Sequence, residues 1–134
     1  MVEDLPCVHK RSCNAGNRLH FSVDDTIGIF QDLTWNENKY ESIFDNDILK
    51  FFKKCHERYG LKVSLYCYYE NEDFNLSMVP NVYIEEFTSN ADWLQFGFHY
   101  RNGLEPQELS AQEIAQDYQK FTNELVRKIG RAHV

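Results

Sequence analysis

The chain has 134 residues, with 21 acidic and 14 basic side chains and a formal net charge of −7 at pH 7. This length suits one domain and is well short of the roughly 250 residues of a complete (β/α)₈ barrel. A hydrophobic fraction of 43% is enough for a packed core and argues against disorder. The acidic balance argues against nucleic acids and anionic membranes as partners, because both attract Lys and Arg.

Residues 1–18 are expected to form an N-terminal arm before a single α/β domain at residues 19–134. We find no basic segment followed by an apolar run at the start, and no stretch long and apolar enough to span a membrane. We therefore expect a cytoplasmic protein with free thiols. Cys7, His9 and Cys13 can be read as a metal cluster, but their spacing fits no structural zinc pattern, so a mobile arm is preferred.

The first half of the domain is predicted to run strand, loop, helix. Apolar and polar residues alternate over residues 19–23, which predicts a strand, and a long aromatic segment at 26–44 predicts a functional loop. A helix follows, capped by Asp45 or Asp47 and ended by Gly60. Its predicted core face consists of Ile48, Leu49, Phe52, Cys55 and Tyr59.

The second half continues the alternation of strands and helices. Strands are predicted at residues 61–69 and 93–99, with a short helix at 82–87 between them. Ser110 and Glu113 form a capping box that predicts the start of a last helix. Its predicted apolar stripe is Ile114, Tyr118, Phe121, Leu125 and Ile129, and Gly130 is its predicted end.

This β-α-β-α-β-α order predicts parallel strands joined by right-handed crossovers. Three helices can cover the two faces of such a sheet only in part. Three strands also leave two unpaired edges, which favour pairing with another chain. We therefore expect a homo-oligomer, with a symmetric dimer as the simplest form.

Polar residues follow the first and third predicted strands, where parallel α/β folds place functional groups. Asp24 and Asp25 follow the first strand, and His99 ends the third. Adjacent carboxylates are stabilised by a cation, so a divalent metal would suit this pair together with the imidazole. The alternative is a polar loop and an ordinary turn histidine. His133 is a further candidate ligand, although a terminal histidine is more often solvated.

The segment 21–26, Phe-Ser-Val-Asp-Asp-Thr, resembles the T-F-D-D-G motif of the polysaccharide deacetylase superfamily, whose fold is a distorted (β/α) barrel. The resemblance implies that Asp24 is the catalytic base and Asp25 a metal ligand. His99 matches the first histidine of the family's H-[ST]-x-x-H motif and would be the second ligand. The implied cofactor is zinc, manganese or cobalt. Arg101 and Asn102, beside His99, are the candidate substrate-binding residues.

Three departures from the family pattern bear on function. Thr26 replaces the motif glycine, and Gly103 stands where the second metal-binding histidine is expected. The sequence also ends where the later barrel strands would follow, so the resemblance covers the first half of a barrel. The expected function is metal-dependent hydrolysis of N- or O-acetyl groups on a carbohydrate or other small substrate. The alternatives are a catalytically inactive carbohydrate-binding or protein-interaction domain, or a part of a longer protein.

Overall fold

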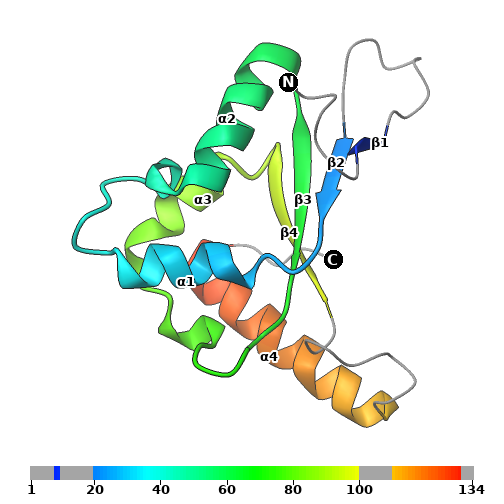
Figure 1. Cartoon of the computed structure of the whole chain (residues 1–134). Helices are drawn as coiled ribbons and strands as arrows, with labels where there is room; N and C mark the ends of the chain where they lie inside the picture. The colour runs from blue at the N-terminus through cyan, green and yellow to red at the C-terminus, as the bar shows by residue number, and fades with distance from the viewer. Residues whose placement is uncertain (1–7, 10–19, 100–109, 131–134) are drawn as a thin grey trace.

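The computed structural model describes residues 8–9, 20–99 and 110–130, and shows a sheet with helices packed beside it (Figure 1). The sheet has the strand order β1-β2-β3-β4. Strands β2, β3 and β4 are parallel, and β1 is antiparallel to β2. The strands are β1 Val8–His9, β2 His20–Val23, β3 Lys62–Cys67 and β4 Leu94–Phe98.

Helices separate the parallel strands, which confirms the predicted α/β class with alternating β-α units. The first crossover contains two α-helices, the second contains one, and the last α-helix follows β4. The α-helices are α1 Ile27–Trp35, α2 Asp47–Tyr59, α3 Ile84–Ser89 and α4 Ala111–Ile129, and the 3₁₀ helices are η3 Ile43–Asp45, η4 Leu76–Met78 and η5 Asn81–Tyr83.

One face of the sheet carries the core. Side chains alternate between faces along a strand, so the register places Phe21, Val63 and Leu94 on the same face. All four α-helices contact this face through aromatic pairs: Phe21–Phe52 for α2, Phe30–Phe96 for α1, Phe87–Phe96 for α3 and Phe98–Phe121 for α4.

The opposite face is polar or small, which is unusual for parallel strands because these are commonly apolar on both faces. Its residues are His20, Ser22, Lys62, Ser64, Tyr66, Gln95 and Gly97. The Tyr66 ring lies against Gly97, where an added Cβ would stand 2.5 Å from Tyr66 Cε1. A parallel sheet with helices on one face is consistent with a partial β/α unit.

The predicted loop at residues 26–44 is wrong, because helix α1 occupies its first part. Ile27, Ile29, Phe30 and Leu33 are buried and attach the helix to the core. Asp32 of α1 fixes the position of the residues that follow the helix. Its carboxylate accepts hydrogen bonds from the Tyr40 hydroxyl (2.8 Å) and the Asn46 amide (2.8 Å). This segment is therefore folded and packed against the core.

Helix α2 is confirmed, but its predicted cap and part of its predicted core face are wrong. The cap is Asn46, whose Oδ1 accepts a hydrogen bond from the Leu49 N–H (2.9 Å). Ile48 is 50% exposed and Tyr59 is 43% exposed, whereas Leu49, Phe52 and Cys55 are buried. The difference arises because α2 packs against β2 through a narrow stripe that includes Phe52, whose ring contacts Phe21, so the apolar residues flanking that stripe face outward.

The last helix, α4, begins and ends as predicted. Ser110 and Glu113 form the capping box, and Gly130 adopts the left-handed conformation with φ 81°. The buried residues include Phe121, Leu125 and Ile129, as predicted, and also three charged residues that no apolar pattern indicates. These are Asp117, Glu124 and Lys128.

One expectation about the edges of the sheet needs correction. Val8 and His9, in the predicted arm, pair with Phe21 and His20 and form β1. The outer edge of β2 is therefore covered at its beginning, not unpaired. The backbone groups of this part of the chain find partners in the sheet, which a sequence pattern of two residues is too short to reveal.

Candidate functional site at the carboxyl edge of the sheet

Three consecutive parallel strands end in polar residues at one edge of the sheet. Asp24 and Asp25 follow β2, Tyr68 follows β3, and His99 follows β4. Parallel strands bring their carboxyl ends together, which is where α/β folds collect functional groups. The side chains from all three strands therefore share one place.

Asp25 lies in a sharp turn between β2 and α1. Among the described residues other than glycine, it alone has a positive φ, 61°. The next residue, Thr26, is buried and donates two hydrogen bonds to the Tyr66 carbonyl, from its backbone N–H (3.2 Å) and its Oγ1 (3.0 Å). This double anchor holds the turn over the end of β3, and left-handed backbone at a non-glycine residue is typical of constrained functional turns.

The turn brings Asp25 to His99, although β3 separates their strands. Asp25 Oδ1 and His99 Nε2 are 3.7 Å apart, and the Asp25 side chain is 63% exposed while that of His99 is 21% exposed. The His99 backbone N–H donates to the Cys67 carbonyl at 2.8 Å, which extends the pairing of β4 with β3 and fixes the start of the His99 side chain. A carboxylate and an imidazole are thus held side by side and open to solvent.

Tyr68 completes the cluster from the middle strand. It is 5% exposed, and its ring meets the His99 ring edge to face at 5.3 Å between centroids. Burial raises the pKa of the Tyr68 phenol above its usual range, and a hydrogen bond to Asp25 and the Asp25 charge raise it further. Burial and the Asp25 carboxylate therefore both favour the neutral, protonated form of the phenol.

Asp24 is exposed and lies beside this cluster. Its charge is the smallest of the causes that raise the pKa of Tyr68. Across residues 8–9, 20–99 and 110–130, however, no group of three His, Cys, Asp or Glu side chains converges on a common metal position. Asp25 and His99 are therefore a pair, whereas a catalytic zinc site uses three protein ligands.

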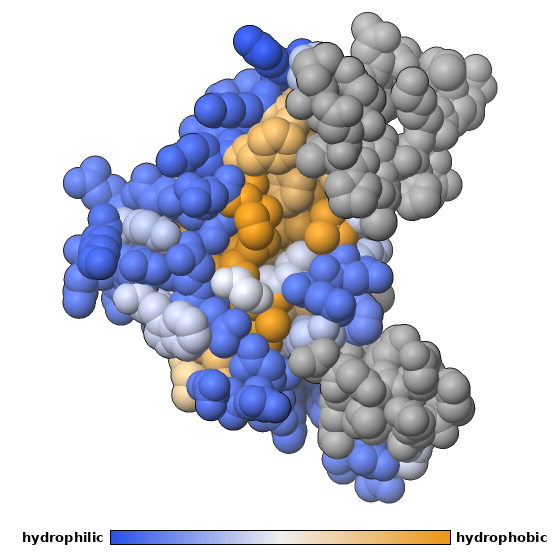
Figure 2. Space-filling model, in the orientation of Figure 1, coloured by the Kyte–Doolittle hydropathy of each residue, from blue (hydrophilic) through white to orange (hydrophobic). Residues whose placement is uncertain are grey.

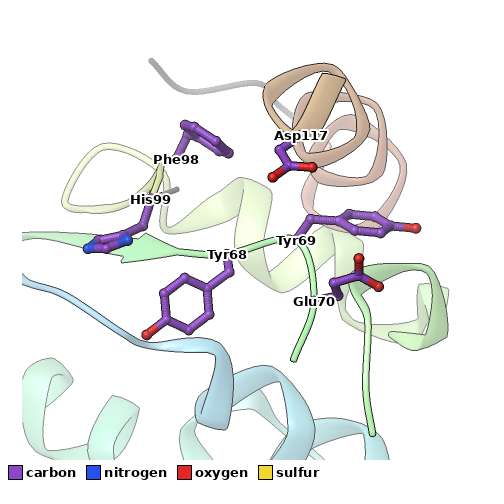
Figure 3. A pocket seen from close by; sticks show the side chains of 6 residues that line it. All are labelled: Tyr68, Tyr69, Glu70, Phe98, His99 and Asp117. Carbon is purple, nitrogen blue, oxygen red and sulfur yellow. The ribbon is translucent and has the colours of Figure 1, made fainter. Parts of the chain in front are cut away.

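A small cavity lies behind His99, toward α4. Figure 3 shows its six lining residues: Tyr68, Tyr69, Glu70, Phe98, His99 and Asp117. The imidazole and the Tyr68 ring point to one side, and Asp117 of α4 and the Tyr69 ring lie on the other. Asp117 is 7% exposed, so a carboxyl group is buried within reach of the strand ends.

Sequence reasoning found two members of the cluster and missed others. Asp25 and His99 come together as expected, whereas Tyr68 was not among the expected site residues. The position of Tyr68 directly after a predicted strand was the signal that could have found it. A second signal was Asp117, a carboxylate placed within the apolar stripe of a helix.

Several candidate residues lie outside the described part of the chain. These are Arg101, Asn102, Gly103 and His133, together with Cys7 and Cys13 of the suggested N-terminal cluster. Cys55 and Cys67 are buried free thiols. None of the helices in the described part of the chain is long and apolar enough to cross a membrane.

No family model matches the chain, and no curated protein or solved structure is significantly similar to it.

Proposed function

We propose that the chain carries a metal-dependent hydrolase site of the deacetylase type, with Asp25 and His99 as metal ligands and Asp24 as the base. The observation that supports it is the 3.7 Å approach of Asp25 Oδ1 to His99 Nε2 across the end of β3. Two atoms that bind one zinc ion at about 2.1 Å in tetrahedral geometry lie roughly 3.4 Å apart. The pair therefore needs only a small adjustment to share a metal.

The residues around the pair have separate tasks in this proposal. The Tyr68 hydroxyl donates to the Asp25 carboxylate and orients it, as partners of metal ligands commonly do. Asp24, exposed beside them, accepts the proton of the attacking water. A bound divalent metal (zinc, manganese or cobalt) would polarise the acyl carbonyl of the substrate. The resemblance to deacetylases makes an acetylated carbohydrate or other small acetylated molecule the expected substrate.

Calorimetric titration of metal-stripped protein with Zn²⁺, Mn²⁺ and Co²⁺ tests the ligand pair. Asp25→Asn and His99→Gln should each weaken binding by more than about tenfold, because each removes one of few protein ligands. Asp92→Asn and His20→Gln are matched controls at the amino ends of β4 and β2, and should change affinity less than about twofold. Binding that is indifferent to Asp25 and His99 would overturn the metal site.

The role of Asp24 is tested separately from metal binding. Asp24→Asn should retain metal affinity while abolishing release of acetate from an acetylated substrate, because the base would be lost and the ligands kept. Loss of metal affinity in this variant would show that Asp24 is a ligand and not the base.

A second candidate function is a non-catalytic binding domain on the same scaffold. The observation that favours it is the pair of ligands, where three are needed, among the described residues. Absence of metal binding by the wild-type protein, with retained binding of a carbohydrate or protein, would establish this alternative.

A further inference from the structure

A second feature adjoins Asp24 and Asp25 on the helical side of the sheet. The carboxyl end of β2 and the first turns of α1 and α2 enclose a hollow of about 150 Å³. Figure 2 shows hydrophobic residues gathered in this hollowed part of the surface, bordered by hydrophilic ones. The hollow is lined by Val23, Asp24, Asp25, Thr26, Gly28, Ile29, Ile48, Phe52 and Leu65.

The walls and the rim of this hollow differ in chemistry. Aliphatic and aromatic side chains form the walls, and Ile48 stands half-exposed at the opening. The carboxylates of Asp24 and Asp25 lie at the end of the hollow that adjoins His99. Ligand pockets commonly combine apolar walls with a few placed polar groups. This hollow has the composition of such a site, and its volume of about 150 Å³ limits the ligand to a small amphiphilic molecule.

Charge decides which amphiphile fits. A carboxylate head would meet two carboxylates and a protein of net charge −7, whereas an ammonium head would be attracted to both. A second copy of the chain would bring the same negative charge to the rim. A sugar would place hydroxyl groups against Val23, Ile29 and Phe52, which offer them no side-chain hydrogen-bond partner.

We propose that this hollow binds the aliphatic chain of a primary amine, with the ammonium group at Asp24 and Asp25. Binding of the amine does not depend on catalysis. Its extension to the reaction rests on the proposed function: the hydrolase would then use water to cleave the neutral amide of an N-acylated aliphatic amine, with the chain in the hollow and the acyl group toward His99. The carboxylate would leave, and the released amine would become the ammonium ion that Asp24 and Asp25 attract.

Calorimetry with three probes tests the ligand class. Hexylammonium combines chain and charge, hexanoate has the chain with the opposite charge, and glucosamine has the ammonium group on a polar ring. We expect hexylammonium to bind at least tenfold more tightly than either, and its affinity to rise about fourfold for each added methylene up to the length of the hollow. Equal binding of hexanoate, or tighter binding of glucosamine, would overturn the proposal.

Gly28 allows the hollow to be blocked without disturbing the fold. A Cβ at this helical position would meet no atom within 4 Å, so a larger side chain can be accommodated. Gly28→Leu should occupy the hollow and weaken hexylammonium binding more than about tenfold, because the displaced chain loses its apolar contacts. Gly28→Ala is the matched control: it makes the same gain in helix propensity but leaves the hollow open, so its affinity should stay within about twofold.

Ile48→Ser is a second test of the apolar wall, because a half-exposed side chain can be replaced at little cost to the stability of the fold. It should weaken hexylammonium binding and leave glucosamine binding unchanged.

Zn²⁺ titration of Gly28→Leu distinguishes this proposal from the proposed metal site. Loss of amine binding with unchanged metal binding supports a separate hollow. Wild-type protein that binds metal but no amine would overturn this inference and leave the metal site standing.

Discussion

Asp25 shows how one residue links the turn, the cluster and the hollow. Its left-handed φ of 61° directs the chain over the end of β3, and its carboxylate raises the pKa of the Tyr68 phenol and approaches His99. Aspartate is among the few residues other than glycine that adopt this conformation at small cost. Asp25 therefore meets two requirements at once: the left-handed backbone of the turn and a carboxylate beside His99.

At this scale we predict that Asp25 controls the ionisation of Tyr68. Asp25→Asn should lower the pKa of Tyr68, because the charge that opposes phenolate formation disappears, although burial keeps the pKa above its ordinary value of about 10. Nuclear magnetic resonance of ¹³C-labelled tyrosine, followed against pH, measures the shift. Asp92→Asn should leave it unchanged, and an unaltered Tyr68 titration in Asp25→Asn would contradict the hydrogen bond.

The same group makes stability depend on pH in a defined direction. The pKa of Tyr68 is higher in the folded than in the unfolded chain, so its contribution to stability is complete below pH about 10 and is lost as pH rises through the folded-state pKa. The free energy of unfolding should therefore fall above pH 10, and less steeply in Tyr68→Phe. Urea unfolding at several alkaline pH values measures both slopes.

Among the elements, α1 is the one whose existence depended most on packing. Its start, Ile27-Gly28-Ile29, contains poor helix formers, and its apolar residues are compatible with a buried loop. Phe30 packs against Phe87 of α3 and Phe96 of β4, which lie far away in the sequence. These contacts stabilise a helix that intrinsic propensity alone does not favour.

Helix α2 provides the prediction at the scale of elements. Asn46 is 5% exposed; it caps α2 through Oδ1 and donates from Nδ2 to Asp32. Asn46→Ala should lower the free energy of unfolding by about 1–2 kcal/mol, because it removes the cap and one hydrogen bond of Asp32. Urea unfolding measures it. Asp47→Asn, at the exposed next residue, should cost less than about 0.5 kcal/mol, and equal costs would contradict the assignment of the cap.

The whole molecule has a one-sided sheet. Helices pack on the face that contains Phe21, Phe96 and Phe98, and the opposite face presents serine, tyrosine and glycine. The pairing of β1 covers the start of the β2 edge, and in the described part of the chain no strand pairs with the outer edge of β4. An open strand edge can pair with a second chain.

We therefore retain the prediction of a homodimer, now centred on the β4 edge. The net charge of −7 opposes association of two copies, so the dimer fraction should rise with salt concentration as the repulsion is screened. Light scattering over a range of protein and salt concentrations measures it. A monomer mass throughout, at high protein concentration and high salt, would contradict the prediction.

The sequence by itself determined the elements whose signals are local. Gly60 and Gly130 ended helices, Ser110 and Glu113 began one, and the alternating strands followed from a period of two residues. These signals depend on neighbours within about four positions, which the sequence shows directly. The placement of Asp25 and His99 at one edge followed from the parallel order of the strands.

Only the tertiary structure decided what depends on distant partners. Ile48 and Leu49 are adjacent and similar, yet one is half-exposed and the other is buried, because the sheet contacts only a narrow stripe of α2. Tyr68 joined the site because the turn at Asp25 crosses the end of β3, and the hollow exists because α1 and α2 leave space beside β2. Such features arise from the packing of segments far apart in the chain, which no local pattern encodes.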